Sequence, residues 1–488
     1  MHLSLLIWLP AAAALFGALL PGRAARAGAV SGSLVTLGLS IAVLVQFKTG
    51  GGLQFITDET WISELGIHYK LGVDGLNLFF ILLATLLFAA TMVWAALQTW
   101  ERESTFFLWL GIAESAVIGA LTAQDLALFV AFFDLMLIPF YFLTGQWGIG
   151  PNRVAGVTKL VIYTLVGSLL MLAAAVATAV LAANGDHLNF TFSFLADHRL
   201  ANGSQNWIFL FFAAAFLVKM PLFPLHGWMP DGYRAMPMPV LAVFSGVLSK
   251  VAAYGFLRIA LPLFPHGSVH YQELMLLIAL ASILYGSAMA FTTTNARLIL
   301  GYSSVAQMGF IVLGIFALRA QGAQGAVLQS VNHGLVVAPA FFIVALLAAR
   351  AGGSEDVRDM GGLAFRAPVL ASLFLIVALA TLAMPGSSNF VGEFLILLGV
   401  FNSKIVIAIV AFTGVALASV YTLRLFIRAM HNRVAPGDES REMTLADGVI
   451  LVPLVAVILF LAVYPQFVLK RTSRETTSAA QAAAAVVR

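Results

Sequence analysis

The sequence predicts an all-α integral membrane protein with about 14 transmembrane helices. Hydrophobic residues make up 61% of the 488 residues and charged residues only 10%, whereas about 25% of an ordinary soluble domain is charged. The mean hydropathy of +0.97 is too high for a soluble domain, which could not bury so much apolar surface. Apolar runs of about 20 residues, the length that crosses a hydrocarbon core, recur along the chain with short connections.

Each predicted span is one apolar run, taken in order along the chain. No basic residue precedes the first run, while Arg23 and Arg26 follow it, so this run is predicted to be an uncleaved span and not a signal peptide. The connection 48–70 and the Ala-rich tail after Lys470 are predicted to be polar segments outside the bilayer. The spans are placed near 3–20, 28–47, 72–97, 104–123, 125–143, 154–183, 206–222, 240–261, 271–291, 297–318, 326–349, 368–402, 404–429 and 446–465.

Two of these spans contain residues that break helices. The seventh reads FLVKMPLFPLH and combines a lysine, two prolines and a histidine; the twelfth contains LAMPGSSNF. Met-Pro marks both breaks, and Pro221 and Pro385 lie about 164 residues apart. Interrupted spans at matching places in two halves are typical of inverted repeats with an ion site at mid-membrane. The pattern therefore predicts broken helices near 219–224 and 384–390 within two related halves.

The distribution of basic residues predicts the orientation of the chain. Loops after odd-numbered spans hold about 13 Lys and Arg residues and those after even-numbered spans about six, and basic loops face the cytoplasm. Both termini are therefore predicted to lie outside. Lys470, Arg471 and Arg474 in the tail argue the other way, but the loops form the majority.

A small set of ionisable residues lies inside the apolar runs. A lysine at the centre of a membrane helix costs about 2.5–3.5 kcal/mol, so such groups are retained for a reason. A structural ion pair, or a side chain that reaches the interface, could explain any one of them. The set balances acids against lysines and histidines, which favours a pathway for protons or ions. These predicted proton-transfer residues are Glu114, Asp134, Lys219, Lys250, His333 and Glu393, with His226 just past the break.

The physical chemistry of buried pairs supports this interpretation. Burial disfavours the charged form of any ionisable group, and a nearby opposite charge favours it. At 4 Å the attraction is about 4 kcal/mol for an effective dielectric constant of 20, or roughly three pKa units. A lysine that approaches or leaves a carboxylate can therefore bind or release its proton near neutral pH.

Other classes of function lack their motifs. The chain has no cysteine, which excludes disulfides, iron–sulfur ligation and thiolate metal sites. Histidines and acids do not show metal-ligand spacing, and neither a P-loop nor a strand–GxGxxG–helix pattern is present. Basic residues are scattered and not clustered with aromatic residues, so no nucleic acid is expected as a partner.

Five longer motifs surround the predicted proton-transfer residues: KMPLFPLHGWMPDGYRAMP, LSKVAAYGFLRI, GYSSVAQMGF, FFDLMLIPFYFLTGQWG and PGSSNFVGEF. They resemble one family, the antiporter-like subunits of respiratory complex I, and most closely its subunit M branch. The similarity extends from about Leu71 to Arg428. PGSSNFVGEF is its most specific part, since Glu393 stands where related L, N and many Mrp-type subunits are expected to carry lysine.

The resemblance implies an antiporter-like fold with two inverted five-helix repeats. It divides the chain into an N-terminal three-helix segment at 1–103, repeats at 104–265 and 266–430, and a last span with the tail at 431–488. In this reading Asp134 is the acidic partner of Lys219, and Lys250 is the central relay. His333 follows, Glu393 is the terminal group, and Glu114 is an auxiliary acid.

The sequence departs from the family pattern at four places. The family generally has Glu where Asp134 stands, and the shorter side chain lengthens the gap to Lys219 or demands a closer approach. Tyr233 and Ala235 replace a histidine and a glutamate of the loop after the seventh-span break. Gln307 replaces a histidine and cannot take up a proton near pH 7. These positions affect the expected path of proton uptake.

The resemblance implies a proton-translocating membrane-arm subunit of NADH–quinone oxidoreductase in a bacterial inner membrane. No cofactor is expected on this chain; NADH, FMN, iron–sulfur clusters and quinone are expected on other subunits. The expected partners are L- and N-type antiporter-like subunits and the lipid bilayer. Two alternatives stay open: a Mrp-type cation/proton antiporter subunit or another complex I-like assembly, and a scaffold subunit whose charges only lock helices together.

Overall fold

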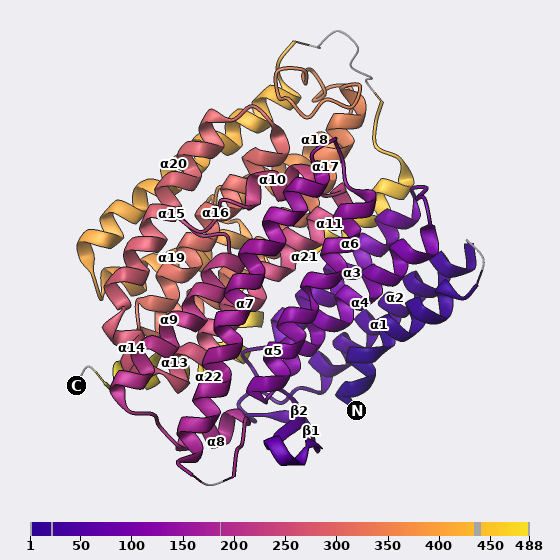
Figure 1. Ribbon diagram of the computed structural model, residues 1–488. Helices are drawn as coiled ribbons and strands as arrows, with labels where there is room; N and C mark the ends of the chain where they lie inside the picture. The colour runs from indigo at the N-terminus through magenta and orange to yellow at the C-terminus, as the bar shows by residue number, and fades with distance from the viewer. Residues whose placement is uncertain (1, 21–22, 186, 434–440, 487–488) are drawn as a thin grey trace.

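In the computed structural model, long helices run side by side across one layer, as a membrane bundle requires (Figure 1). The structure describes residues 2–20, 23–185, 187–433 and 441–486. Among these residues, eleven helices are long and apolar enough to cross a membrane, and three shorter apolar helices accompany them. The predicted membrane class and antiporter-like helical fold are confirmed. The count of 14 spans and the four-part division of the chain stay predictions.

The first half of the bundle is built from seven helices that follow the predicted spans. Residues 125–143, predicted as one span, form two helices that meet at Met136. The helices are α1 (Leu3–Ala18), α2 (Arg23–Gln46), α3 (Leu78–Ala96), α4 (Glu103–Thr122), α5 (Leu126–Leu135), α6 (Leu137–Trp147) and α7 (Arg153–Ala183).

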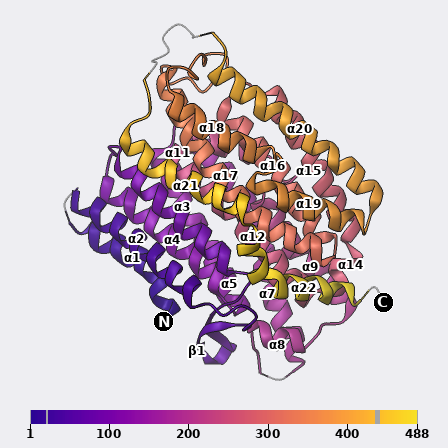
Figure 2. The same ribbon diagram turned by 180° about the vertical axis from the view of Figure 1, so that it is seen from behind.

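The second half continues with spans and half-spans that pack beside the first (Figure 2). Short helices α8 (Phe192–Asp197) and α14 (Pro265–His270) lie in connections. The others are α9 (Asn202–Lys219), α10 (Met229–Ala235), α11 (Met238–Val243), α12 (Ser249–Gly255), α13 (Leu261–Leu263), α15 (Gln272–Thr292), α16 (Ala296–Phe316), α17 (Ala320–Arg350), α18 (Pro368–Thr381), α19 (Ser388–Phe401), α20 (Ile405–Met430) and α21 (Leu445–Val463).

Both predicted helix breaks are present. Helix α9 ends at Lys219, two residues before Pro221, because proline lacks the N–H and its ring clashes with the preceding turn. The chain resumes as α10 after the second proline. Helix α18 ends at Thr381, and Ala383 and Gly386 then adopt positive φ angles of 52° and 92° before α19 begins. Each break interrupts the helical hydrogen bonds of its span, and residues on both sides of the break are partly exposed, such as Phe223 and Met384.

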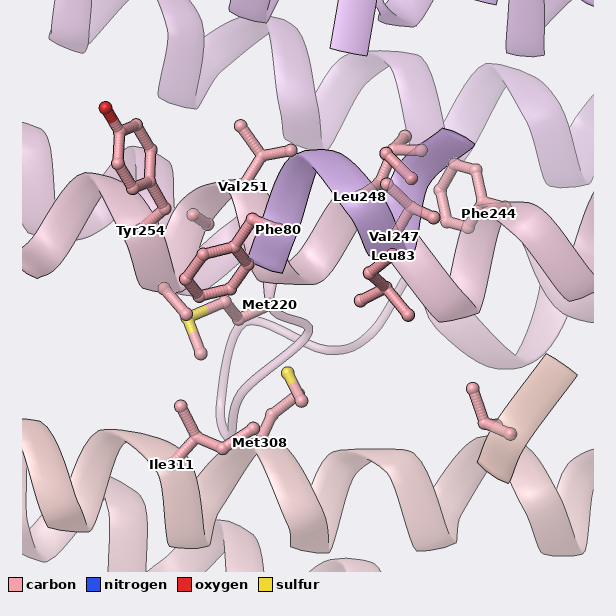
Figure 3. Packing of buried hydrophobic residues seen from close by; sticks show 14 of the residues in the cluster. Phe80, Leu83, Met220, Phe244, Val247, Leu248, Val251, Tyr254, Met308 and Ile311 are labelled. Carbon is pink, nitrogen blue, oxygen red and sulfur yellow. The ribbon is translucent and has the colours of Figure 1, made fainter. Parts of the chain in front are cut away.

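The backbone of the eighth span departs from a regular α-helix, and no sequence pattern predicts this departure. Its α-helical pieces α11, α12 and α13 are joined by two π-helical segments, η2 (Phe244–Leu248) and η3 (Phe256–Ala260). Lys250 lies in the seven-residue piece between them. Apolar side chains of this span, including Phe244, Val247 and Val251, pack into the core (Figure 3). Single-turn π segments occur frequently at functional sites.

Two elements were predicted only as polar connections. Residues within 48–70 form an antiparallel hairpin of β1 (Gln54–Ile62) and β2 (Ile67–Val73), with the short 3₁₀ helix η1 (Ser63–Leu65) between the strands. The tail forms α22 (Gln466–Ala484), which packs against α17 and α13 through a stripe of small side chains such as Thr472 and Ala480. The predictions missed both because each element is stabilised by contacts far along the chain and not by a long apolar run.

Glycines allow α17 and α19 to cross closely beside Glu393. A Cβ added at Gly325 would lie 2.7 Å from the backbone nitrogen of Ile396 and 2.8 Å from the carbonyl oxygen of Gly392. Backbone atoms cannot move aside as a flexible side chain can. Small residues at such crossings are typical of membrane helix pairs.

We expect Gly325→Ala to destabilise the chain by about 1–3 kcal/mol, because the added methyl group overpacks this crossing. Thermal unfolding of the detergent-solubilised complex measures the effect. Gly203→Ala is the matched control, since a Cβ there meets no atom within 4 Å and alanine favours a helix. Equal unfolding temperatures for the two variants would contradict the close packing.

Candidate functional site

Lys219 and Asp134 face each other across α9 and α5 without forming a direct ion pair. The Lys219 side chain is 5% exposed; its Nζ donates to the carbonyl oxygen of Phe133 at 3.3 Å and lies 4.3 Å from the centroid of that ring. Lys219 ends α9, where a helix dipole favours a cation. Asp134 is half-buried and interacts electrostatically with Lys219, although no salt bridge within 4.0 Å joins them.

His226 lies in the irregular segment between α9 and α10. Its ring stacks on Phe223 and lies 4.7 Å, centroid to centroid, from Tyr285. The side chain is buried, and its Nδ1 has no hydrogen-bond partner among the described residues. An unpaired imidazole nitrogen seven residues beyond Lys219 is able to exchange a proton with water.

Lys250 is the most deeply buried cation of the predicted set, at 1% exposure. Its Nζ donates to the carbonyl oxygen of Ser245 at 2.7 Å and to Oγ of Ser249 at 3.2 Å. The hydroxyl groups of Ser245 and Ser304 are 3.4 Å apart. Lys250 therefore has polar partners, but among the described residues it forms no hydrogen bond or salt bridge with an acid.

His333 on α17 lies close enough to Lys250 for the two side chains to interact electrostatically. It is buried, and its Nδ1 has no hydrogen-bond partner among the described residues. Thus the predicted histidine and the predicted central lysine lie within range of an electrostatic interaction.

Glu393 on α19 belongs to a buried polar cluster. Its Oε1 accepts from Nε2 of Gln307 at 2.8 Å and from Nε2 of Gln329 at 3.2 Å, and Gln329 also donates to Oε1 of Gln307 at 2.7 Å. The hydroxyl group of Tyr421 lies 3.0 Å from Oγ of Ser303 and interacts electrostatically with Glu393. Oε2 of Glu393 has no partner among the described atoms.

Glu114 stands apart from the other predicted residues. It is fully buried on α4, and both carboxyl oxygens lack a close hydrogen-bond partner among the described residues. The hydroxyl of Ser33 on α2 is a polar group that acts on it. Among the described residues, no hydrogen bond or salt bridge directly joins any two of the seven predicted side chains.

Sequence reasoning missed two buried ion pairs at the ends of the bundle. Arg297, 1% exposed, donates to Glu355 from Nη2 at 2.5 Å and from Nη1 to the carbonyl oxygens of Tyr233 and Met236 at 2.9 and 2.5 Å. Near the β-hairpin, Nη2 of Arg258 donates to both carboxyl oxygens of Asp74 at 2.6 Å. Sequence reasoning also missed Gln329, the second amide that donates to Glu393. The partner acids lie in connections, so no pattern within one apolar run connects them to their arginines.

The site gathers side chains that can bind and pass protons. No group of three or more His, Asp or Glu residues in the described part of the chain could hold a metal ion. The buried groups are amines, imidazoles, carboxyls, hydroxyls and amides, all of which exchange or orient protons.

The comparisons with known proteins agree with this chemistry. A family model described as "NADH:quinone oxidoreductase/Mrp antiporter, TM" matches residues 123–418. NADH-quinone oxidoreductase subunit M of Rhodobacter capsulatus is 36% identical over 484 residues, covering 96% of this chain and 94% of the relative. The chain belongs to the subunit M family. The Escherichia coli K12 member of the subunit M family is 35% identical over 456 residues, covering 90% and 89% of the two chains.

Two solved structures have folds similar to that of this chain. A chain of respiratory complex I from Thermus thermophilus with bound NADH matches with a TM-score of 0.91 at 30% identity, covering 99% of this chain and 100% of that chain. A chain of the Mrp complex from Dietzia sp. matches with a TM-score of 0.84 at 20% identity, covering 99% and 100%, which shows a common fold. The resemblance seen in the motifs is confirmed.

Proposed function

We propose that this chain is the proton-translocating subunit M of a bacterial NADH–quinone oxidoreductase. One observation carries the proposal: a chain of the subunit M family buries two lysines, a histidine and a glutamate on α9, α12, α17 and α19 without neutralising them in direct salt bridges. Buried charged side chains that serve only stability are expected to form salt bridges with each other. Groups left without a charged partner are free to change protonation state.

In the proposed mechanism, redox work elsewhere in the complex alters the electrostatic interaction between Asp134 and Lys219. A change in that interaction changes the proton affinity of Lys219, and then of Lys250 and His333. Glu393, held by Gln307 and Gln329, is the terminal group of the path. The path needs water molecules between these side chains, because no hydrogen bond or salt bridge among the described residues joins them directly. Glu114 and His226 serve the same path as auxiliary groups.

The remaining parts of the proposal concern the surroundings of the chain. The redox reaction, with NADH, FMN, iron–sulfur clusters and quinone, is assigned in this proposal to other subunits. L- and N-type antiporter-like subunits are the proposed neighbours in the membrane arm. Both termini face outside the bacterial inner membrane, as the basic loops indicate.

Lys219→Ala tests the proposal. In the purified complex reconstituted into liposomes, we expect the protons pumped per NADH oxidised to fall, and coupled turnover to drop at least about tenfold. Subunit content, measured on the same preparation, is expected to stay normal. The measurement is fluorescence quenching of a pH-sensitive dye during NADH oxidation.

Lys404→Ala is the matched control, because Lys404 lies at the surface and its salt bridge with Glu273 is exposed. Loss of assembly without loss of pumping in the assembled fraction would support the scaffold alternative. Pumping that requires Na⁺ would support a cation antiporter instead.

A further inference from the structure

An apolar groove opens at the surface of the bundle between α2, α3, α17 and α21. It has a volume of about 260 Å³, and its wall consists of Leu, Ile, Val and Phe side chains. Two lining residues, Ile41 and Phe460, are each 47% exposed, so the groove is accessible from outside the chain. In a membrane protein, such a groove contacts whatever lies in the surrounding bilayer.

The groove lies in the half of the bundle that carries the β-hairpin. It is lined by the last turns of α2, the first turns of α3 and the end of α21, and by Phe467 at the start of α22. Figure 2 shows α21 leading into α22 on this side. Arg474 of α22 donates to the carbonyl oxygen of Gly50, just past α2, so α22 passes beside the end of α2. One end of the groove is therefore near the membrane surface, next to α22.

Arg471 provides a cation without an acidic partner at this end. Its guanidinium carbon lies 4.4 Å from the centroid of the Phe467 ring, and its Nη1 donates to the carbonyl oxygen of Phe467 at 2.8 Å. Its Nε is buried and has no hydrogen-bond partner among the described residues. A buried N–H donor is expected to find an acceptor. An acceptor for Arg471 is therefore expected from outside the chain.

The surroundings of Arg471 carry an excess of positive charge. Lys470 and Arg474 lie on α22, and Lys48 follows the end of α2. Among the described residues, none of these four basic side chains forms a salt bridge. Glu475 is a nearby acid and interacts electrostatically with Arg474. A molecule with an anionic head and an apolar chain complements both the basic residues and the groove.

We propose that this groove binds one acyl chain of an anionic phospholipid, and that Arg471 binds the phosphate of its headgroup. A guanidinium group donates two parallel hydrogen bonds to phosphate oxygens. An α-helix with its side chains is about 10 Å across and fills about 400 Å³ per turn. The groove is thus too small to seat a helix of a neighbouring subunit, whereas an acyl chain is narrow enough to enter it.

The bound acyl chain packs against the segment of α17 that carries His333. Val331 and Leu335 line the groove, about one helical turn apart. His333 lies midway between them in sequence, which places it on the opposite face of the helix. The lipid therefore supports this turn of α17 without contact with the imidazole. Lipid binding does not depend on the proposed proton-translocating function.

The test is photocrosslinking in the intact complex, reconstituted into liposomes that contain phosphatidylglycerol with a diazirine group in its acyl chain. Peptide mass spectrometry locates the crosslinks, which are expected on α2 and α21. Arg471→Gln keeps an amide donor but removes the charge. We expect it to lower these crosslinks about tenfold, the loss of one charge-assisted hydrogen bond. Arg358→Gln is the matched control, since Arg358 is 69% exposed in the connection after α17.

Ile41→Trp tests the groove independently of the headgroup. The indole ring fills the groove, so the crosslinks on α2 and α21 are expected to fall at least as far as in Arg471→Gln. The subunit content of the complex is expected to stay normal, because position 41 is half exposed. Val406→Trp is the matched control: Val406 is 70% exposed on α20 and does not line the groove.

Four outcomes would overturn the lipid site. The first is the absence of crosslinks on α2 and α21 in the wild type, and the second is an unchanged yield in Arg471→Gln. The third is an equal yield from diacylglycerol with the same diazirine chain, which would show that no phosphate is bound. The fourth is a crosslink from benzoylphenylalanine at position 41 to another subunit, which would show that a protein covers the groove. None of these results measures proton pumping, so the proposed function stands or fails separately.

Discussion

Replacing Lys250 by methionine is expected to reduce proton pumping by the reconstituted complex about 100-fold. Without a basic side chain, a proton that crosses the middle of this chain is a bare charge at the bilayer centre. Such a charge costs about 2.5–3.5 kcal/mol. Because each 1.36 kcal/mol changes a rate tenfold, this cost corresponds to about 100-fold. Methionine has a similar length and keeps the packing of α12, so the subunit content of the complex is expected to stay normal. Dye quenching per NADH oxidised measures the effect.

Lys250→Arg distinguishes proton transfer from a purely electrostatic role. Arginine keeps a positive charge but does not release its proton in proteins. We therefore expect Lys250→Arg to pump as poorly as Lys250→Met, while Lys404→Met at the surface pumps normally. Normal pumping by Lys250→Arg would mean that only a fixed charge is needed, which contradicts the relay role.

Arg297→Ala is expected to destabilise the chain by about 3–5 kcal/mol, the largest effect on stability that the structure predicts. The substitution leaves Glu355 without its guanidinium partner and removes the donor for the carbonyl oxygens of Tyr233 and Met236. Arg297 is 1% exposed, so water cannot replace these bonds fully. The temperature at which the solubilised complex unfolds is the measurement.

Arg358→Ala serves as the control for this prediction. Arg358 pairs with Asp356 in the same connection, but its side chain is 69% exposed, so the expected change is below about 1 kcal/mol. The double variant Arg297→Ala with Glu355→Ala is expected to recover part of the loss, because it also removes the orphaned acid. Similar unfolding temperatures for Arg297→Ala and Arg358→Ala would refute the structural importance of the buried pair.

The sequence predicted those parts of the fold that depend on local composition. Apolar runs placed the spans, and the prolines at positions 221 and 385 placed both breaks, because proline acts on its own helix. Lys250 and Glu393 were recognisable because a charge inside an apolar run is rare. The electrostatic interaction between Lys250 and His333 was predicted only through the family resemblance.

The rest depends on contacts between distant segments, which one sequence does not reveal. Gln329 approaches Glu393 only because α17 and α19 cross at glycines. The partner of Arg297 lies 58 residues away, in a connection with no distinguishing pattern. The two π-helical segments around Lys250 have no composition signal that separates them from α-helix. The hairpin and α22 were missed for the same reason.

The two buried arginine pairs have a mechanical consequence for the segment that carries Lys250. Near one membrane face, Arg297 donates hydrogen bonds to the carbonyl oxygens of Tyr233 and Met236, just before α11. Toward the other face, Arg258 in η3 donates to the carboxylate of Asp74. Hydrogen bonds thus hold both ends of the segment in place, and the backbone between them is irregular. It resists sliding as a rigid rod along the membrane normal. A displacement of Lys250 must therefore come from bending of the segment between its two held ends. Such a movement stays small and leaves both membrane faces undisturbed.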